Sequence, residues 1–291
     1  MTATSPSPTR PQMITTVREA QQFVVAQTRA GKTVGLVPTM GALHAGHLSL
    51  VSRSRQECDC TAVSIFVNPT QFAPGGDYQK YPRPLDDDLA MLSESGVDMV
   101  FAPSAEEMYP AGFSNYVEVG EIAQPWEGVC RPGHFRGVAT VVLKLFQIVP
   151  AQRAYFGRKD FQQVLVVKRM VADFNLPIEI VTCPLVRDAD GLALSSRNAY
   201  LSSDERRAAL VLSRSLQAAK EMFAAGQRDA AAIRAAMLRC ISQEPEVNVE
   251  YVAIANPETL AELSQIAGSA VALIAARVGS TRLIDNELLG R

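Results

Sequence analysis

Apolar and polar positions change their spacing along the chain, and each change marks an expected element. Short runs of β-branched and aliphatic residues are typical of buried strands, whereas apolar residues three or four positions apart are typical of amphipathic helices. We therefore expect strands at residues 34–38, 61–68, 99–103, 154–157 and 178–183. By the same pattern we expect helices at residues 17–28, 48–57, 86–95, 138–149 and 161–174.

These strands are apolar along their length, and they alternate with helices up to about residue 185. Such alternation predicts an α/β fold of the Rossmann-like, doubly wound kind, in which helices cover both faces of a parallel sheet. Ligands of these sheets bind at the carboxyl ends of the strands. The turns that follow the strands are therefore the expected place for a functional site.

The pattern changes in the last third of the chain. Ser202 and Glu205 fit a capping box, and apolar residues at helical spacing follow it. A second, Ala-rich helix is expected from Asp229, and β-like runs follow at residues 249–255 and 271–285.

We therefore predict three parts. Residues 1–12 are rich in Ser, Thr and Pro and are expected to form a mobile tail. Residues 13–185 are expected to form the Rossmann-like domain, and residues 186–291 a smaller α+β domain.

Composition and charge narrow the class of protein. Hydrophobic residues make up 47% of the 291-residue chain and charged residues 20%, as in ordinary soluble proteins. A net charge of −2 gives no electrostatic reason for a nucleic-acid or membrane partner. No apolar run has membrane-spanning length, and the N-terminus lacks the pattern of a signal peptide. The five cysteines are scattered, which indicates reduced thiols and predicts a cytoplasmic protein.

Two of the three histidines, His44 and His47, lie in the segment VPTMGALHAGH, between an expected strand and an expected helix. Such a junction presents backbone N–H groups and the positive end of the helix to an anion. Gly41 and Gly46 bracket the imidazoles, as expected where backbone closely approaches a ligand. We predict a phosphate site, in which protonated imidazoles neutralise charge that develops on phosphorus.

Metal binding is the alternative for these histidines. A third ligand would be required, and Asp77 or the run Asp86–Asp88 supplies the candidates. Cys58 and Cys60 could begin another site, but no second pair follows at zinc-like spacing. We favour phosphate binding over both.

Two further motifs carry groups that suit phosphates. Ser195, Ser196 and Arg197 follow a flexible turn, and arginine offers a planar fork of donors to phosphate oxygens. Lys159 follows an expected strand end, where Gly157 permits a close approach of the backbone.

Polar residues in apolar surroundings indicate a second compartment. Gln71 and Gln163 suit a small hydroxy acid held by neutral hydrogen bonds, and Asn68 shapes the strand end beside Gln71. The third histidine, His134, lies in RPGHFRG with Arg131 and Arg136. This segment either closes over the site or is purely structural, and the sequence leaves both alternatives open.

HAGH together with a downstream Ser-Ser-Arg resembles the adenylylating superfamily that carries the HIGH and KMSKS signatures. More closely, PTMGALHAGH, SIFVNPTQF, RPGHFRGV, FGRKDFQQ and DGLALSSRN together resemble the pantothenate synthetase (pantoate–β-alanine ligase) family. These motifs span residues 38–198 in the family's order, and RVGSTRLIDN adds a weaker match. Leu194 and Arg158 depart from the usual family residues, but neither departure removes a polar group assigned above.

The resemblance implies a ligase that forms a C–N amide bond. Members of this family condense (R)-pantoate with β-alanine through a pantoyl-adenylate, using ATP and Mg²⁺. His47 matches the proton donor of the family. The residues expected to stabilise charge on the phosphates are His44, His47, Lys159, Ser195, Ser196 and Arg197. The residues expected at ATP are Met40, Gly41, Ala42, Leu43, His44, Ala45, Gly46, His47, Gly157, Arg158, Lys159, Asp160, Val186, Leu194, Ser195, Ser196 and Arg197.

The resemblance also assigns the other ligands. Gln71 and Gln163 match the pantoate-binding glutamines, Asn68 lies with them, and Gln71 is expected near β-alanine. Mg²⁺ is expected to be held mainly by phosphate oxygens and waters, with a contribution from Asp87 or Asp88 left open. A homodimer is implied, and the second domain is expected to close over the first and exclude water.

Other functions remain as alternatives. An HxGH nucleotidyltransferase would leave the nucleotide on its product, whereas a ligase releases AMP once an amine acceptor is present. A regulatory module could keep the nucleotide site without turnover. A tRNA synthetase is disfavoured because the chain is short, slightly acidic and has no recognisable anticodon-binding module.

Overall fold

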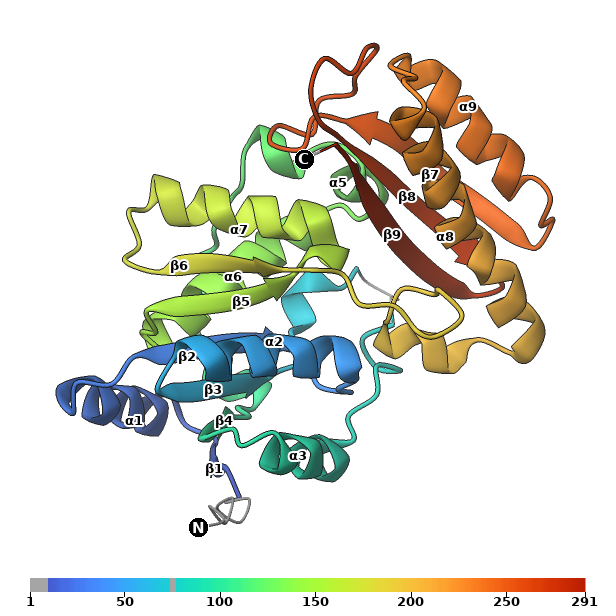
Figure 1. The fold of residues 1–291 in the computed structure, drawn as a ribbon. Coiled ribbons are helices and arrows are strands. Elements are labelled where there is room, and N and C mark those ends of the chain that lie inside the picture. Colours follow the sequence, from blue (N-terminus) through green and yellow to red (C-terminus); the bar gives the residue numbers. More distant parts are fainter. Residues whose placement is uncertain (1–9, 74–76, 291) are drawn as a thin grey trace, which may run out of the picture.

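The computed structural model describes residues 10–73 and 77–290 (Figure 1). Within them lie a six-stranded parallel sheet in the order β1-β4-β3-β2-β5-β6 and a three-stranded antiparallel sheet in the order β7-β8-β9. The α/β, doubly wound prediction is therefore confirmed, together with the smaller C-terminal α+β part.

The bounds of the elements are as follows. The strands are β1 (Gln12–Ile14), β2 (Val34–Thr39), β3 (Cys60–Ile65), β4 (Met99–Phe101), β5 (Arg153–Gly157), β6 (Glu179–Cys183), β7 (Val247–Ala255), β8 (Ala270–Val278) and β9 (Thr281–Leu289). The α-helices are α1 (Val17–Arg29), α2 (Ala45–Glu57), α3 (Leu85–Glu94), α4 (Ala105–Met108), α5 (Glu127–Cys130), α6 (His134–Ile148), α7 (Phe161–Asp173), α8 (Ser203–Ala224) and α9 (Ala230–Ile241). The short 3-10 turns are η1 (Pro69–Gln71), η2 (Glu121–Ala123), η3 (Arg158–Asp160) and η4 (Ser196–Tyr200).

Helices cover both faces of the large sheet because its strands are apolar on both sides. Residues of α1, α6 and α7 pack with one set of strand side chains, which includes Leu36 and Ala62. Residues of α2 and α3 pack with the alternate set, which includes Val37 and Val63. Adjacent residues thus point to opposite faces, and all four are fully buried.

The N-terminal end differs from the prediction. β1 pairs with β4, so Gln12 lies in the sheet opposite Met99 and not in a tail. A three-residue strand is too short to show a hydrophobic period, and for this reason the pattern missed it. Residues 1–9 of the predicted tail lie outside the described residues.

Two predicted helices begin earlier than their apolar pattern. α2 begins at Ala45 and not at residue 48, because the side chain of His44 caps its first turn. α6 begins at His134 and not at residue 138, directly after the left-handed Gly133.

The C-terminal part follows its sequence signals. Ser202 and Glu205 form the predicted capping box at the start of α8. The long β-like run at residues 271–285 contains β8, a turn and the first part of β9. One face of the small sheet packs against α8 and α9, and its other face packs against Trp126, Phe161 and Leu165 of the part that contains the large sheet.

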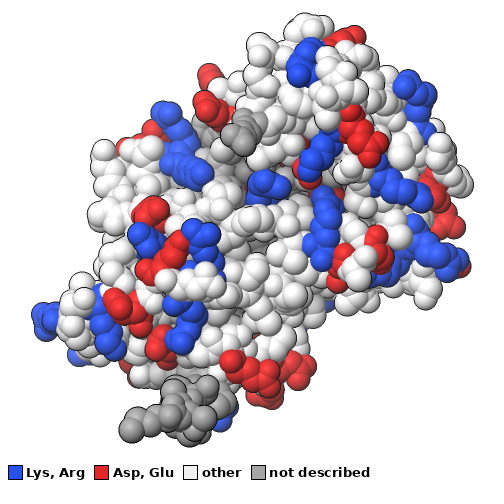
Figure 2. Space-filling model, viewed as in Figure 1, with Lys and Arg blue, Asp and Glu red and all other residues white. Residues whose placement is uncertain are grey.

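The surface agrees with the near-neutral composition. Lysine and arginine side chains alternate with acidic ones over the face shown in Figure 2, without a broad patch of one sign. In the part of the chain that the structure describes, no helix is long and apolar enough to span a membrane.

Candidate active site

A cavity of about 200 Å³ lies at the carboxyl ends of the central strands, where the doubly wound fold predicts a ligand. The residues that follow β2, β3, β5 and β6 contribute to its lining, and the segment before α8 closes one end. Residues from the five main motifs meet there, together with Val186, namely Met40, His44, Gly46, His47, Asn68, Gln71, Arg131, His134, Gly157, Lys159, Asp160, Gln163, Val186, Leu194, Ser195, Ser196 and Arg197.

The two histidines lie at the start of α2, with their ring centroids 4.1 Å apart. His44 is the N-cap residue, and its Nδ1 accepts a hydrogen bond from the backbone N–H of Gly46 at 3.1 Å. The proton of a neutral His44 therefore lies on Nε2, which leaves this atom as a donor. The backbone N–H groups of this helix start and the two imidazoles together form a suitable phosphate site.

Burial determines the charge of these imidazoles. Desolvation, followed by the positive charge of Lys159, lowers the pKa of His44 to about 4. Desolvation, followed by His44 and then Lys159, lowers the pKa of His47 to about 3. Both rings are thus neutral at neutral pH before substrate binds, and the protonated rings that the sequence analysis expected belong to the phosphate-bound state. The negative charge of a bound phosphate acts in the opposite direction and raises both pKa values.

The loop before α2 is held from behind by an acidic residue of α3. The carboxylate of Asp88 accepts hydrogen bonds from the N–H groups of Ala42 at 2.9 Å and Leu43 at 2.7 Å. Gly41 and Ala42 both have positive φ angles, 78° and 50°, which turns these N–H groups toward Asp88. A Cβ on Gly41 would lie 2.9 Å from Asp88 Oδ2, so the absence of a side chain here permits the close approach of this carboxylate.

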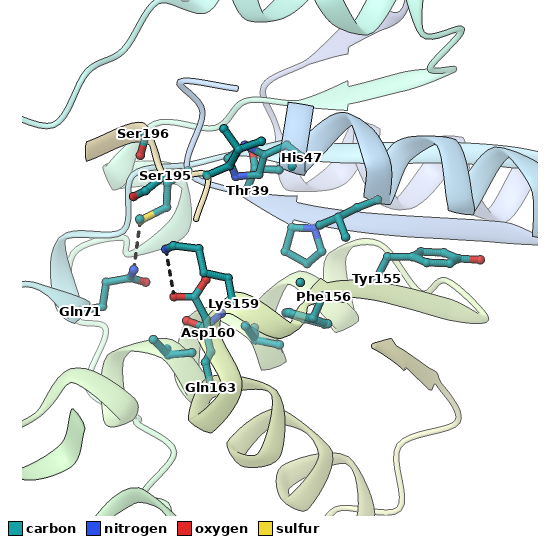
Figure 3. A pocket seen from close by; sticks show the side chains of 18 of the residues that line it. Thr39, His47, Gln71, Tyr155, Phe156, Lys159, Asp160, Gln163, Ser195 and Ser196 are labelled. Carbon is teal, nitrogen blue, oxygen red and sulfur yellow. Dashed lines mark hydrogen bonds and ion pairs between the residues drawn. The ribbon is translucent and has the colours of Figure 1, made fainter. Parts of the chain in front are cut away.

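Lys159 lies in η3, the turn between β5 and α7. Figure 3 shows Lys159, Asp160 and Gln163 on one side of the cavity, with His47 and Thr39 across from them. The Nζ atom of Lys159 is 3.8 Å from the carboxylate of Asp160, and the lysine side chain is 20% exposed. A largely buried amine at the strand end is well placed to meet a phosphate.

The Ser195–Arg197 segment closes one end of the cavity and is fixed by residues from the loop after β3. Tyr81 OH lies 3.0 Å from Ser196 Oγ. Arg197 pairs with Asp77 at 2.8 Å and lies 5.7 Å from the centre of the Tyr81 ring. These contacts hold a guanidinium and two hydroxyls beside the other candidate phosphate groups.

Neutral amides line the second compartment. Asn68 Nδ2 donates to Gln71 Oε1 at 3.1 Å, and Gln71 Nε2 lies 3.0 Å from the sulfur of Met40. Gln163 lines the same cavity from the first turn of α7. An apolar part of the wall is formed by Phe66, Val138, Val141, Val142, Leu145 and Phe156. An apolar wall with a few amides suits a small branched hydroxy acid.

His134 is buried beside this compartment and contacts the backbone of Gln71. Its Nδ1 lies 3.0 Å from the backbone oxygen of Gln71, so Nδ1 carries the proton and donates. Its Nε2 accepts from Arg131 at 3.0 Å, and burial lowers the pKa of His134 to about 3. Arg136 does not join them, because it pairs with Glu118 and stacks on Tyr116. His134 and Arg131 both line the cavity, so these contacts place the imidazole in its wall, where it supports the backbone of Gln71.

The metal alternative receives no support from the candidate ligands. Asp77 pairs with Arg197, each oxygen of Asp88 accepts a loop amide, and Cys58 lies 3.3 Å from Tyr155 OH. Within residues 10–73 and 77–290, no three His, Cys, Asp or Glu side chains are grouped as a metal ion would require.

The model of one protein family, described as pantoate-beta-alanine ligase, matches residues 12–288. The chain belongs to this family. The match includes both sheets, so it extends well beyond the residues around the cavity.

Relatives and solved structures agree with the family model. The chain is 57% identical to a pantothenate synthetase of Roseiflexus castenholzii over 92% of its own length and 96% of the relative. It is 52% identical to one of Moorella thermoacetica over 96% of its length and 98% of the relative.

Two crystal structures resemble the fold of this ligase along nearly its whole length. Pantothenate synthetase of Thermus thermophilus has a TM-score of 0.92 and 49% identity, over 96% of this chain and 100% of that one. Pantoate-beta-alanine ligase of Francisella tularensis, complexed with beta-gamma ATP and beta-alanine, has a TM-score of 0.80 and 35% identity, over 96% and 97% of the two chains.

Some residues predicted at ATP do not line the cavity of the ligase. Leu43 is packed in the core between α2 and the sheet, and the N–H groups of Ala42 and Leu43 point to Asp88. Gly41, Ala45 and Arg158 are likewise absent from the lining. These residues form the turns behind the cavity, and a sequence motif does not separate lining residues from the residues that support them.

The sequence analysis also missed residues of the site. Tyr81 lies between the strand expected at residues 61–68 and the helix expected at residues 86–95, and it belongs to none of the predicted motifs. Asp88 was considered only as a metal ligand, whereas its carboxylate holds the loop before α2. Arg131 lines the cavity, and desolvation lowers its pKa to about 10. No local pattern distinguishes these residues, although the RPGHFRG motif did include Arg131.

Proposed function

We propose that this chain condenses (R)-pantoate with β-alanine through a pantoyl-adenylate, and that it releases AMP and pyrophosphate. The observation that carries the proposal is one cavity with two kinds of lining. Histidines, a lysine, an arginine and serines gather at one end, and an apolar compartment with the amides of Gln71 and Gln163 adjoins them. Its family membership and the beta-gamma ATP and beta-alanine complex of the Francisella tularensis relative support the same activity.

The first half-reaction is adenylation. A carboxylate oxygen of pantoate attacks the α-phosphorus of ATP, the bond from this phosphorus to the bridging oxygen breaks, and pyrophosphate takes the electron pair. His44 donates through Nε2, while Lys159 and Arg197 balance the charge on the phosphates. Fixed cations and donors in a partly dehydrated cavity stabilise this developing charge more than water does.

His47 is assigned as the proton donor of this step. Its ring is buried beside His44, and its Nδ1 has no hydrogen-bond partner among the described residues. Phosphate binding raises its lowered pKa, so that the ring can take up a proton as the substrates assemble and donate it to a phosphate oxygen.

The second half-reaction is amide formation. The neutral amine of β-alanine attacks the acyl carbon of the adenylate, the acyl–oxygen bond to AMP breaks, and the nitrogen loses a proton. Gln71 is assigned to both organic substrates, because its amide projects into the compartment beside Met40. Its orientation is fixed by Asn68 on the side chain and by His134 on the backbone.

The proposal also includes bound Mg²⁺, a homodimer, closure of residues 186–291 over the cavity and a cytoplasmic location. The described residues offer no three-ligand cluster, so Mg²⁺ would be held mainly by phosphate oxygens and water, where it supplies charge neutralisation. Closure of residues 186–291 over the cavity would protect the adenylate from hydrolysis. The homodimer rests on the family resemblance, and the cytoplasmic location rests on the scattered cysteines.

The test is to measure AMP and pyrophosphate made from ATP and Mg²⁺ with purified protein, pantoate, and β-alanine present or absent. AMP release that requires both organic substrates is the expected result. Pyrophosphate without AMP, even with β-alanine present, would favour the nucleotidyltransferase. If neither AMP nor pyrophosphate is released with pantoate and β-alanine both present, the ligase proposal is contradicted.

A further inference from the structure

Asn286, in β9 of the C-terminal part, contacts the turn that carries Lys159. Its side-chain Nδ2 donates to the backbone oxygens of Arg158 at 2.9 Å and Lys159 at 3.0 Å. The residue is only 1% exposed. Only the nitrogen of an amide can donate to two carbonyl groups, so this contact determines the orientation of the side chain.

The preceding residue, Asp285, holds the other phosphate segment. Its carboxylate accepts two hydrogen bonds from Arg187, at 2.6 and 3.0 Å, and one from the backbone N–H of Asn286 at 2.7 Å. Arg187 also donates to the backbone oxygen of Gly191 and pairs across this loop with Ala193. The loop thus fixed leads directly into Ser195–Arg197.

Two adjacent residues of one strand therefore hold two separate segments that each carry cavity residues. β9 is an edge strand of the small sheet, and Figure 1 shows it beside the first domain, next to the segment that follows β6. Asp285 and Asn286 belong to RVGSTRLIDN, the one family-like segment for which the proposed function leaves no role.

We propose that Asp285 and Asn286 form a positioning clamp, which sets the distance between Lys159 and Ser195–Arg197 and so makes adenylation depend on the C-terminal part. Neither residue lines the main cavity, so both act through the residues that they hold. The inference rests on the proposed function, because it assumes that ATP phosphates lie between the two segments.

The physical reason lies in the short turn itself. η3 has three residues, and the amide of Asn286 donates from outside the turn to the carbonyl groups of two of them. Without these donors the turn loses its fixed contact with β9, and the flexible lysine side chain follows any shift of its backbone. A misplacement of about 1 Å at a reacting centre is enough to lower a rate about 100-fold.

A double-mutant cycle tests the clamp. We expect Asn286→Ala to lower the rate constant of AMP formation about 10- to 100-fold and to weaken ATP binding, with the KM for pantoate unchanged. When Asn286→Ala is added to Lys159→Ala, the rate should fall by less than about 2-fold relative to Lys159→Ala alone. The reason is that the lysine side chain through which Asn286 acts is already absent. Equal losses in both backgrounds, or a loss confined to pantoate KM, would overturn the proposal.

Asn286→Asp is an isosteric second variant. The introduced carboxylate cannot donate to the two carbonyl groups, so activity relative to the unaltered enzyme should be low at neutral pH. It should recover partly as the pH is lowered, since a protonated carboxyl regains one O–H donor and burial raises its pKa. Asn248→Asp, at an exposed position of β7, is the matched control and should follow the unaltered pH profile. Coincident pH profiles for the two variants would also overturn the clamp.

Two further measurements separate the possible failures. ATP binding, measured by equilibrium dialysis without pantoate, reports on the clamp even if the organic substrates are assigned wrongly. Unaltered enzyme that binds ATP but makes no AMP from pantoate and β-alanine would contradict the proposed function alone. Unchanged ATP binding in a folded Asn286→Ala variant, checked by thermal melting, would contradict the clamp.

Discussion

Each of the three histidines has a different hydrogen-bonding role, although burial lowers the pKa of all of them. His44 accepts from a helix N–H, His134 donates to a carbonyl group, and His47 offers a buried nitrogen without a described partner. Because desolvation is the largest cause in each case, a bound anion can restore the proton at His44 and His47. His134 faces Arg131, a cation that keeps it neutral.

His134 makes a stability prediction possible. Its pKa lies at about 3 in the folded protein against an ordinary value of 6.5, so only the unfolded chain takes up a proton between these values. The free energy of unfolding therefore falls as the pH is lowered through this window, by up to about 1.4 kcal/mol per pH unit for this group. His134→Asn keeps a donor for Gln71 but cannot titrate.

Urea unfolding at about pH 7 and about pH 5 measures the effect. We expect the loss of stability between these two conditions to be about 2 kcal/mol smaller in His134→Asn than in the unaltered protein. An equal loss in both proteins would show that His134 is not held neutral by the fold.

At the scale of elements, the start of α2 combines a helix cap with a candidate catalytic site. The cap is a histidine, which is not among the residues that usually cap helices, so its side chain serves two purposes. α3 supplies the second support, since Asp88 holds the loop that precedes the cap. The phosphate end of the cavity therefore depends on two helices that pack on the same face of the sheet.

Substitutions of His44 separate these purposes. His44→Ala should lower the free energy of unfolding by about 1 kcal/mol through loss of the cap, and should lower the adenylation rate about 100-fold or more. His44→Asn should restore the stability, because asparagine is a strong cap, but not the rate. Thermal melting together with pyrophosphate release measures both. A His44→Asn variant with nearly full adenylation would rule out a chemical role for the imidazole.

At the scale of the whole molecule, a buried ionic network joins the two parts of the chain. Glu127 of α5 accepts two hydrogen bonds from Arg282 of β9, at 2.6 and 2.8 Å, and one from Tyr251 of β7 at 2.9 Å. Arg131 is 3.9 Å from the same carboxylate and also contacts His134. The C-terminal part is thereby connected to the compartment around Gln71, as well as to the phosphate segments.

Breaking this network should destabilise the protein strongly. Arg282→Met leaves the buried carboxylate of Glu127 without its main partner, and we expect a loss of about 3–5 kcal/mol in the free energy of unfolding. The double variant Glu127→Gln/Arg282→Met should recover part of this loss, since the buried carboxylate that lost its main partner is no longer charged. Arg214→Met, which removes an exposed ion pair with Glu244, is the control and should change stability little.

Denaturant unfolding followed by fluorescence or circular dichroism measures these differences. The prediction would be contradicted if Arg282→Met were no less stable than Glu127→Gln/Arg282→Met.

The sequence by itself determined the alternation of strands and helices, the capping box at Ser202 and the motifs around His44, Lys159 and Ser195. These features depend on neighbouring residues, whose spacing follows the period of a strand or a helix. It did not determine β1, which is too short for a period, or the helical starts at Ala45 and His134, which depend on a cap and a left-handed glycine.

Only the tertiary structure decided which distant residues meet. Tyr81 reaches Ser196, Asp88 holds Ala42, and Asn286 holds the turn of Lys159 across more than a hundred residues of chain. No local pattern encodes such pairs, because they arise when the apolar faces of separate elements pack and bring polar groups at the margins of those faces together. The same packing decides protonation, since burial and not residue type lowered the pKa of every histidine.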